Sequence, residues 1–473
     1  MEKVRTRFAP SPTGKMHVGN LRSAIFEYLV AKSLDGDFIL RIEDTDQKRK
    51  VEGAEDLIFD TLEKCGITID ESPKHGGDFG PYVQSERIEI YKEYAHKLVE
   101  EKNAYFCFCS SERLDKLRKE AEEKKVAFLY DGHCSRLSKE EVDKKINNGE
   151  KYVIRQKTPN EGISAYNDLV YGEIKVENKL LEDQILLKSD GFPTYNFANV
   201  IDDNLMGITH IVRGNEYLSS TPKYNLLYDA FGFERPKYIH LPLVVDEERK
   251  KLSKRHGASP FKDLENKGYL PEGIVNYLAL LGFSPETNDE IFTLDELVEI
   301  FKVNRINKSP AVYDVKKLNW INAHYMKKLE EKKLFEITIP HLKNNYNTEN
   351  KSDEWLKELV LLYQDHISFG EEIVKETELF FQNDLELPDE AKDILESEGV
   401  NEMLLIFKEQ IEKIEDWNVS EISNAINKTK EISGVKGKML FMPIRIKTSG
   451  RMHGPELPNT IYLIGKDNVL NRF

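Results

Sequence analysis

The sequence predicts an α/β fold in which a parallel-sheet domain, interrupted by an insertion, is followed by a wholly helical region. Patterns of strand, loop, helix and strand succeed one another within the first 43 residues, and this succession is typical of a βαβ unit with a parallel sheet. Strand-like stretches return between residues 195 and 245. Beyond Lys262 the apolar residues recur almost entirely at helical spacing.

Local signals define the first βαβ unit. Residues 4–10 form a short strand, and the stretch 10–14, rich in Pro and Gly, forms a turn. Residues 21–32 have the periodicity of a helix with one apolar face. The next strand covers 38–43 and ends in an acidic run that begins at Glu43.

Changes of pattern divide the rest of the chain. A highly charged helix at 110–125 and β-rich stretches at 152–155 and 168–171 indicate an insertion. The sheet then resumes at 195–202, continues at 210–213 and returns at 239–245. We therefore expect five segments: the first half of the sheet domain at 1–107, an insertion at 108–190, the second half at 191–260, a helical segment at 261–325 and a second helical segment at 326–473.

Composition limits the class of protein. A chain of 473 residues is too long for one core, and 40% apolar with 32% charged residues fit a globular protein of several domains. No window of about 18 residues is free of charge, which argues against a membrane span. The first residues contain no apolar signal core. Four cysteines form no disulfide framework, so we expect a protein of the reducing cytoplasm.

The charge distribution permits an RNA partner. The net charge of −15 argues against nucleic acid when taken alone, because Lys and Arg drive phosphate binding. A footprint is local, however, and five of the seven residues at 249–255 are basic. Residues 433–473 hold seven basic and two acidic residues, a local charge of +5.

Two segments have the chemistry of phosphate binding. The loop and helix start at His17-Val18-Gly19-Asn20 would offer free N–H groups and the positive end of a helix dipole to an anion. Gly14 and Gly19 would let the backbone approach a phosphate closely. The basic loop Lys251-Leu252-Ser253-Lys254-Arg255 would neutralise a polyphosphate. A capped helix start and a solvated basic turn are the ordinary readings of each segment by itself.

Together these segments resemble two motifs of class I aminoacyl-tRNA synthetases. The first is similar to His-Ile-Gly-His and the second to Lys-Met-Ser-Lys-Ser, in the same order along a split nucleotide-binding sheet. Asn20 and Arg255 depart from the last position of each motif, a relaxation familiar in the glutamyl/glutaminyl subgroup. The resemblance implies catalytic roles for His17, Lys251 and Lys254. It implies ATP binding by Gly14, His17, Gly19, Asn20, Lys251, Leu252, Ser253 and Lys254.

Three further stretches, 7–14, 192–203 and 210–216, resemble glutamyl-tRNA synthetases nearly residue for residue. The chemistry agrees, because an Arg can clamp a carboxylate through its fork and an acid can receive an ammonium group. Arg213 is our choice for the side-chain carboxylate of glutamate, and Glu43 for its ammonium. Alone, each could be a surface ion pair or a core polar group. The residues that the family assigns to the glutamate pocket are Arg7, Ala9, Ser11, Glu43, Tyr195, Asn199 and Arg213.

Three of the four cysteines are clustered and predict a structural zinc site. Cys107 and Cys109 are separated by one residue, and Cys134 follows after a further 24 residues. Zinc needs four ligands, and three buried apolar thiols are the alternative reading. Some relatives place a tyrosine four residues before the last cysteine, which favours Tyr130 over His133 as the fourth ligand. Cys65 belongs to an apolar helix and is expected to pack in a core.

The resemblance implies a glutamate–tRNA ligase with a split Rossmann-like catalytic domain at 1–107 and 191–260. It implies an insertion that binds the tRNA acceptor end, a helical stem-contact domain and an all-helical anticodon-binding domain. The expected partners of this monomeric, cytoplasmic enzyme are ATP with Mg²⁺, L-glutamate and tRNA-Glu, with tRNA-Gln as an open second substrate. The alternatives are a glutaminyl-tRNA synthetase with a β-barrel anticodon part, a shorter adenylyltransferase, a truncated tRNA-modifying paralogue and an inactive RNA-binding paralogue.

Overall fold

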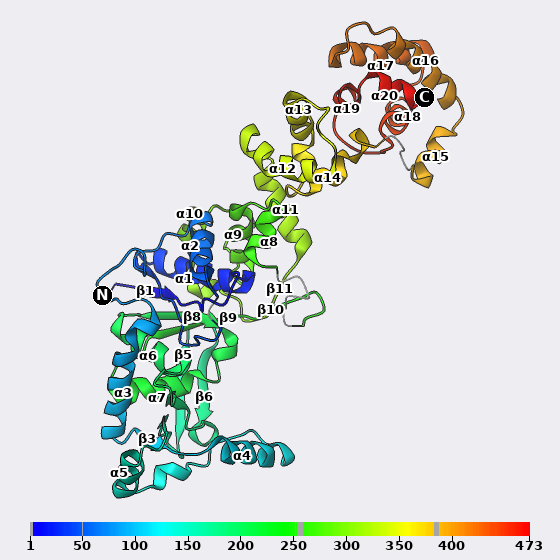
Figure 1. Ribbon diagram of the computed structural model, residues 1–473. Coiled ribbons are helices and arrows are strands. Elements are labelled where there is room, and N and C mark those ends of the chain that lie inside the picture. Colours follow the sequence, from blue (N-terminus) through cyan, green and yellow to red (C-terminus); the bar gives the residue numbers. More distant parts are fainter. Residues whose placement is uncertain (1–2, 50, 251, 253–258, 383–386) are drawn as a thin grey trace. The chain divides into compact units, whose positions relative to one another are not determined.

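The computed structural model describes residues 3–49, 51–250, 252, 259–382 and 387–473 (Figure 1). The chain forms two compact units, one made of 1–263 with 275–315 and the other of 264–274 with 316–473. The first unit is α/β and the second is helical, which confirms the predicted fold class. The predicted loop at 251–255 lies outside the described residues except for Leu252, whose N–H donates to the Val244 carbonyl over 3.1 Å.

The first βαβ unit forms as predicted. β1 (Arg5–Phe8) pairs in parallel with β2 (Asp37–Leu40), and α1 (Val18–Lys32) connects them. Nearly every residue of α1 from Leu21 to Ala31 is buried, because the helix lies inside the unit rather than on its surface. Both strands are shorter than the sequence suggests. Beyond β2 the chain continues through α2 (Ala54–Lys64), with Cys65 buried at its end as expected.

The second half of the sheet domain contains one wrong prediction. Residues 195–202, which we expected to be a strand, belong to the helix α6 (Tyr195–Leu205). The run from Phe197 to Asp203 is buried throughout, so its apolar residues do not alternate with exposed ones as they would on a surface helix. A short, fully buried apolar run cannot be assigned to strand or helix by periodicity alone.

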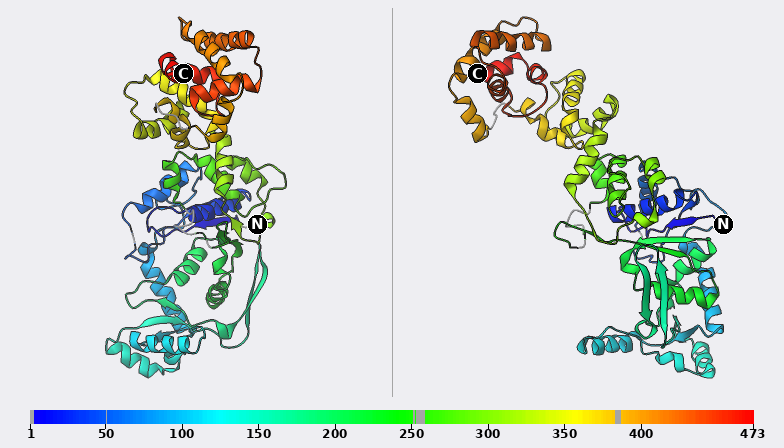
Figure 2. Two further views of the ribbon diagram at one scale, coloured as in Figure 1. Left: turned by 90° about the vertical axis from the view of Figure 1, so that its right-hand side faces the viewer. Right: turned by 180° about the vertical axis from the view of Figure 1, so that it is seen from behind.

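A four-stranded sheet carries the other half of the site. Its order is β6-β5-β9-β8, in which β5 and β8 lie parallel to β9, and β5 and β6 form an antiparallel hairpin. A hydrogen bond of 3.0 Å from the Thr209 N–H to the Arg5 carbonyl connects this sheet to β1. Figure 2 shows the hairpin as two long arrows from two further sides. The strands are β5 (Ile163–Asp168), β6 (Gly172–Glu177), β8 (His210–Gly214) and β9 (Lys237–Leu241).

The insertion has its own small sheet and short helices. Its sheet has the antiparallel order β3-β4-β7. The expected charged helix is α4, and none of its residues is buried. The remaining elements of the first unit are α3 (Ile88–Glu100), β3 (Ala104–Cys107), α4 (Ser111–Glu123), α5 (Lys139–Asn147), β4 (Val153–Gln156), β7 (Ile185–Leu187), α7 (Thr221–Phe231), β10 (Val244–Val245), α10 (Leu294–Ile300) and β11 (Ala311–Val312). The helices α8 (Phe261–Asn266) and α9 (Pro271–Leu280) span the unit boundaries.

The second unit contains no strand among its described residues. One apolar core joins its helices, and two tryptophans donate indole N–H groups to the end of α19. Trp355 bonds the Leu463 carbonyl at 3.1 Å and Trp417 the Tyr462 carbonyl at 3.0 Å. The helices are α11 (Val315–Met326), α12 (Glu331–Asn345), α13 (Asp353–Tyr363), α14 (Glu372–Thr377), α15 (Asp389–Leu395), α16 (Val400–Glu412), α17 (Val419–Ser433), α18 (Lys438–Ser449), α19 (Leu457–Ile464) and α20 (Lys466–Asn471).

Two buried carboxylates near the end of α6, Asp202 and Asp203, connect separate parts of the first unit by hydrogen bonds. Asp202 accepts hydrogen bonds from Arg87 (2.7 Å), from Gln84 (2.9 Å) and from the Tyr91 hydroxyl (2.8 Å). Asp203 accepts from Arg7 (3.0 Å) and from Arg41 (2.8 Å). All of these side chains are buried. A buried charge is tolerated only when it is paired and hydrogen-bonded, so these contacts are a condition of the fold.

Removing one member of this network should strongly destabilise the first unit. The Asp202→Ala variant would leave the Arg87 charge buried without its carboxylate, and we expect a loss of about 3–5 kcal/mol. The control is Asp229→Ala, which removes a carboxylate paired with Arg235 on the surface and should cost about 0–1 kcal/mol. Urea unfolding monitored by circular dichroism measures both. Equal losses in the two variants would contradict the structural role of Asp202.

Candidate active site and metal site

A cavity of about 1000 Å³ opens in the first unit, where β1, β2 and β8 end. Ligands of open parallel sheets bind at this carboxyl edge of the strands. Its wall includes most of the residues predicted for the amino-acid pocket. From the predicted set the wall contains Arg7, Ala9, Ser11, Asn20, Glu43, Tyr195 and Arg213.

The other predicted site residues lie away from this wall or outside the described residues. Asn199 is buried on α6, one turn beyond Tyr195, and its Nδ2 has no hydrogen-bond partner among the described residues. Lys251, Ser253 and Lys254 lie outside the described residues, so the structure says nothing of the second phosphate segment apart from Leu252. Gly14, His17, Gly19, Asn199 and Leu252 do not line the cavity in the part of the chain that is described.

His17 forms the N-cap of α1. Its backbone is extended (φ −79°, ψ 147°), and its Nδ1 accepts a hydrogen bond of 3.2 Å from the Gly19 N–H. In a neutral ring the hydrogen then resides on Nε2, which makes that nitrogen a donor. Gly14 precedes it with φ +126°, in the left-handed region that favours glycine. Backbone N–H groups at such a helix start form a ready anion site.

The guanidinium of Arg7 is already engaged by protein carboxylates. It binds Asp203 in bidentate geometry, with Nε–Oδ1 at 3.0 Å and Nη2–Oδ2 at 3.2 Å, and Glu27 lies 3.7 Å from Nη1. Burial is the largest influence on Glu27 and holds the pKa of that carboxyl well above its usual range. Although burial alone would raise the pKa of Asp203, the neighbouring guanidinium groups of Arg7 and Arg41 lower it. Arg7 therefore faces the cavity as a charge with a fixed ionised partner.

Glu43 is an acid of the cavity wall whose pKa lies near neutral pH. Burial raises the pKa of Glu43 to about 7, although the cations of Arg41 and Arg7 oppose the shift. Arg41 donates from Nη2 to Glu43 Oε1 over 3.2 Å. An acid poised in this range is a feature of functional sites, because a nearby charge can decide its state.

Arg213, at the end of β8, differs from Arg7 in its partners. Its Nε donates to His240 Nε2 (3.3 Å) and its Nη2 to the Thr221 hydroxyl (2.7 Å). The guanidinium carbon also lies 4.7 Å from the ring centre of Tyr224 and 5.1 Å from that of Tyr217. None of the described residues forms an ion pair with it. Arg213 thus presents a buried cation, held by neutral groups, to the cavity.

Sequence reasoning missed the side chains that fix these groups. Asp203 accepts hydrogen bonds from Arg7, and Arg41 donates to Glu43. His240 accepts a hydrogen bond from Arg213 and is itself bonded to Asp168. Consecutive aspartates inside a largely apolar stretch are the one signal that could have pointed to buried partners, because isolated charges are not buried. Their partners are 111 to 196 residues away, so no local pattern identifies them.

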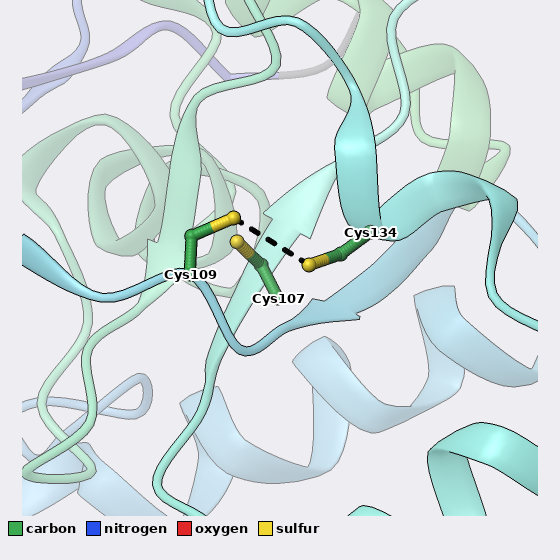
Figure 3. Close-up of side chains that lie close together, drawn as sticks. All are labelled: Cys107, Cys109 and Cys134. Carbon is green, nitrogen blue, oxygen red and sulfur yellow. Dashed lines mark hydrogen bonds between the residues drawn. The ribbon is translucent and has the colours of Figure 1, made fainter. Parts of the chain in front are cut away.

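The predicted cysteine cluster is present in the insertion. The sulfur atoms of Cys107, Cys109 and Cys134 lie within 4.8 Å of one another, as Figure 3 shows. Cys109 and Cys134 are 3.6 Å apart. Arg155 donates to the Cys107 sulfur at 3.4 Å, a contact that favours the thiolate that a metal needs.

Tyr130 lies in this cluster and His133 lies outside it. The Tyr130 hydroxyl is 3.4 Å from the Cys107 sulfur and 3.2 Å from that of Cys109. It also accepts the Cys134 backbone N–H at 3.2 Å. His133 is exposed, and its ring nitrogens are not among the clustered ligand atoms. The donor set of three sulfurs and one oxygen fits a tetrahedral zinc ion.

Two protein-family descriptions match the chain. Residues 3–320 match the family of class I tRNA synthetases (E and Q), catalytic domain, and residues 333–473 match an anticodon binding domain. The chain therefore belongs to the class I tRNA synthetases of the glutamate and glutamine group.

Within that class it belongs to the glutamate–tRNA ligases. It is 50% identical to the glutamate–tRNA ligase of Clostridium botulinum (strain Loch Maree / Type A3), with 99% of this chain and 97% of the relative covered. The corresponding Bacillus licheniformis protein is 46% identical, with 99% and 98% covered. Crystal structures of the glutamate–tRNA ligase from Elizabethkingia meningosepticum and the glutamate–tRNA synthetase from Elizabethkingia anophelis have TM-scores of 0.87 and 0.89. They are 36% and 35% identical and cover the whole chain, with 98% and 99% of their own chains covered.

These matches cover the full chain, which confirms the predicted enzyme class over a short adenylyltransferase or a truncated paralogue. The described part of the second unit is helical, whereas a glutaminyl-tRNA synthetase was expected to carry a β-barrel there. Among the described residues, no helix combines the length and apolar character that a membrane crossing requires.

The ionisation of Glu43 should control glutamate use near neutral pH. Only the carboxylate form can pair with an ammonium group, and the pKa of Glu43 is raised to about 7 by burial. We expect kcat/KM for glutamate to fall about tenfold per pH unit below that value and to level off above it. In the bound complex the ammonium stabilises the carboxylate, so the kcat profile should bend at lower pH.

Aminoacylation assays between pH 5.5 and 8.5 measure this dependence. Glu43→Gln should raise KM for glutamate and flatten the profile. Glu63→Gln, an exposed position on α2, is the control and should keep the wild-type curve. The same bend in the Glu43→Gln profile would assign the titration to another group.

Proposed function

We propose that the cavity binds L-glutamate with its side-chain carboxylate on Arg213 and its ammonium on Glu43. The observation that supports this most is the contrast between two buried arginines. Arg7 is neutralised by Asp203, whereas Arg213 has only neutral partners among the described residues. A buried cation without a counter-ion gains most from an incoming carboxylate, and it gains little from the amide of glutamine.

The rest of the pocket comes from the same wall, except that Asn199 lies one turn behind it on α6 and does not line the cavity. Arg7, held in place by Asp203, and Ser11 lie near the α-carboxylate in our proposal. Tyr195 and Asn199 share one face of α6, and the unpaired Asn199 Nδ2 is a donor suited to the substrate. Ala9 leaves room on the same side. These roles rest on the motif resemblance together with the geometry.

We infer that ATP lies along the start of α1, with its phosphates near the backbone N–H groups from Gly14 to Asn20. His17 Nε2 and the cations Lys251 and Lys254 stabilise the charge that develops on the reacting phosphate, and Ser253 and Leu252 complete the loop. Mg²⁺ bound with ATP neutralises part of the triphosphate charge. Positioning and charge stabilisation supply most of the rate enhancement, because no protein nucleophile is needed.

The reaction proceeds in two steps. A carboxylate oxygen of glutamate attacks the α-phosphorus of ATP in line, and the bond to the bridging oxygen breaks to release pyrophosphate. A hydroxyl of the terminal adenosine of tRNA then attacks the activated carbonyl carbon, which expels AMP. In class I enzymes the attacking hydroxyl is the 2′-OH.

We propose that residues 108–190 receive the acceptor end of tRNA-Glu, that 261–325 contact its stem and that 326–473 bind its anticodon. The match of 333–473 to an anticodon binding domain supports the last assignment. In this proposal the enzyme acts as a monomer in the cytoplasm, a reducing compartment that suits four cysteines with no disulfide among them. Charging assays with purified tRNA-Glu and tRNA-Gln decide whether the second tRNA is also a substrate.

We also propose a structural zinc ion in the insertion, held by Cys107, Cys109, Cys134 and Tyr130. The three sulfurs lie within 4.8 Å of one another, and the Tyr130 hydroxyl lies 3.4 Å and 3.2 Å from two of them. When bound, zinc would cross-link the end of β3 to the segment 130–136. It would supply stability and take no part in the transfer chemistry.

Replacing Arg213 tests the assignment of the pocket. In Arg213→Ala the glutamate side chain loses its charged partner, and we expect kcat/KM for glutamate to fall at least about 30-fold, which corresponds to about 2 kcal/mol. Activation of glutamine should change little, so discrimination between the two amino acids is lost. Arg235→Ala removes an exposed arginine of the same unit and is the control. An unchanged preference for glutamate in Arg213→Ala would refute the proposal.

Metal analysis tests the zinc site without reference to activity. We expect about one zinc ion per purified chain, lost in Cys134→Ser and weakened in Tyr130→Phe. His133→Ala should keep its metal, because His133 lies outside the cluster. Mass spectrometry of metal content and a thermal unfolding curve provide the two readouts. If Tyr130→Phe kept its full zinc content and His133→Ala lost zinc, the fourth ligand would be His133 and not Tyr130.

A further inference from the structure

Three adjacent strands bring the side chains of Asp168, His240 and Arg213 into a chain of hydrogen bonds. The strand order is β5-β9-β8, and each of these strands contributes one residue. His240 and Arg213 are direct partners in the register of β8 and β9. His240 Nδ1 lies 2.6 Å from Asp168 Oδ2, and Arg213 Nε lies 3.3 Å from His240 Nε2.

The hydrogen-bond partners determine where the imidazole proton resides. Arg213 Nε–H can only donate, so His240 Nε2 must accept with its lone pair. The ring hydrogen is therefore on Nδ1 and is donated to Asp168. The Thr221 hydroxyl does not compete for the lone pair, because it donates to the Tyr217 carbonyl at 2.8 Å. A doubly protonated ring would place an N–H opposite the N–H of Arg213.

The acidic end of this chain of hydrogen bonds is fixed by backbone groups. Asp168 Oδ1 accepts the N–H groups of Val170 (2.9 Å) and Tyr171 (2.8 Å). Asp168 Oδ2 accepts the His240 backbone N–H at 3.2 Å as well as the ring. Every hydrogen-bond partner of the Asp168 carboxylate among the described residues is a donor. The carboxylate and the imidazole are 1% and 0% exposed, so water does not replace these contacts.

The surroundings also keep the imidazole neutral. Burial lowers the pKa of His240, and the Arg213 cation lowers it further, while Asp168 and Glu216 oppose the shift. The other groups that face the ring are the Thr221 hydroxyl and the side chains of Tyr166 and Tyr238. A neutral ring with its lone pair on Nε2 is an acceptor that holds Arg213 without cancelling its charge.

We propose that Asp168 and His240 form a positioning relay that fixes the His240 tautomer and so aims the free edge of the Arg213 guanidinium at the substrate carboxylate. The relay deepens the proposed function, since it rests on Arg213 as the group that binds the side chain of glutamate. A carboxylate in place of His240 would hold Arg213 as firmly. It would also neutralise the guanidinium, as Asp203 does for Arg7. The relay therefore gives both orientation and charge, on which selection for an acid over an amide depends.

Asp168→Asn is the sharpest perturbation of this relay. The amide oxygen is expected to face the two backbone N–H groups of Val170 and Tyr171, which leaves the amide NH₂ facing His240 Nδ1. The ring hydrogen must then move to Nε2, where it opposes the Arg213 N–H. The exchange of Asp for Asn beside a histidine is known to enforce the wrong tautomer while the geometry is kept.

The tautomer can be observed directly in the full-length enzyme. Histidine labelled with ¹⁵N gives separate ring signals for protonated and unprotonated nitrogens, and the loss of one set in His240→Gln assigns those of His240 among the 11 histidines. We expect Nδ1–H in the wild type and Nε2–H in Asp168→Asn. An Nε2–H or doubly protonated ring in the wild type would overturn the relay.

Steady-state kinetics provide the second readout. In Asp168→Asn we expect KM for glutamate to rise at least about tenfold, since a buried donor loses its acceptor, while kcat changes less. The preference for glutamate over glutamine should fall with it. His240→Gln retains an acceptor that can face Arg213 and should keep more of that preference than His240→Leu. Asp229→Asn, the same exchange at an exposed site, should match the wild type.

The outcomes separate the relay from the pocket assignment. If Arg213→Ala leaves the glutamate preference intact, the pocket assignment fails first. If Arg213→Ala abolishes the preference but a folded Asp168→Asn keeps it, the relay alone is wrong. Thermal unfolding curves identify any variant that fails to fold, and in that case the tautomer of the wild type still decides the proposal.

Discussion

The paired carboxylates at the end of α6 are the interaction on which the first unit depends. Asp203 binds Arg7 of β1 and Arg41 beyond β2. Asp202 binds Arg87, which precedes α3, and Tyr91 within α3. These partners come from the first half of the split sheet domain, whereas α6 opens the second. Desolvated charges tolerate little displacement, because each loses the only groups that compensate it. The network therefore holds the two halves of the sheet domain together. The cavity lies where their strands end.

The same network distributes charge around the cavity. Because Asp203 is used to neutralise Arg7, that arginine cannot by itself distinguish an acid from an amide. Arg213 retains its full charge among Thr221, tyrosine rings and a neutral His240. Glu43, with its pKa raised to about 7 by burial, is the acid that can still respond to a ligand. In the proposed pocket, selection for a negatively charged side chain therefore depends on Arg213, because Arg7 is already paired with Asp203.

The sequence predicted those features that depend on neighbouring residues. The βαβ unit, the strand at 210–213 and the cysteine cluster each follow from short spacings, and all three are present. The helix α6 was missed because Phe197, Val200 and Ile201 form a short buried run that periodicity cannot assign. The wall residues of the pocket came from motifs. Their supporting charges could not be predicted, since Arg7 and Asp203 are 196 positions apart in the sequence.

The insertion is joined to the pocket by a short backbone connection. Asp168 is the last residue of β5, and β5 meets β9 through the single register pair Asp168 and Tyr238, with one backbone bond of 2.9 Å from the Leu169 N–H to the Tyr238 carbonyl. Asp168, which is hydrogen-bonded to the His240 ring, therefore belongs to the segment that we assign to the tRNA acceptor end. A shift of β5 along β9 would change the partner of the His240 ring before it disturbed any residue of the cavity wall. In the proposed pocket, the residues that select the amino acid and the segment 108–190 share one buried hydrogen bond, between Asp168 and His240.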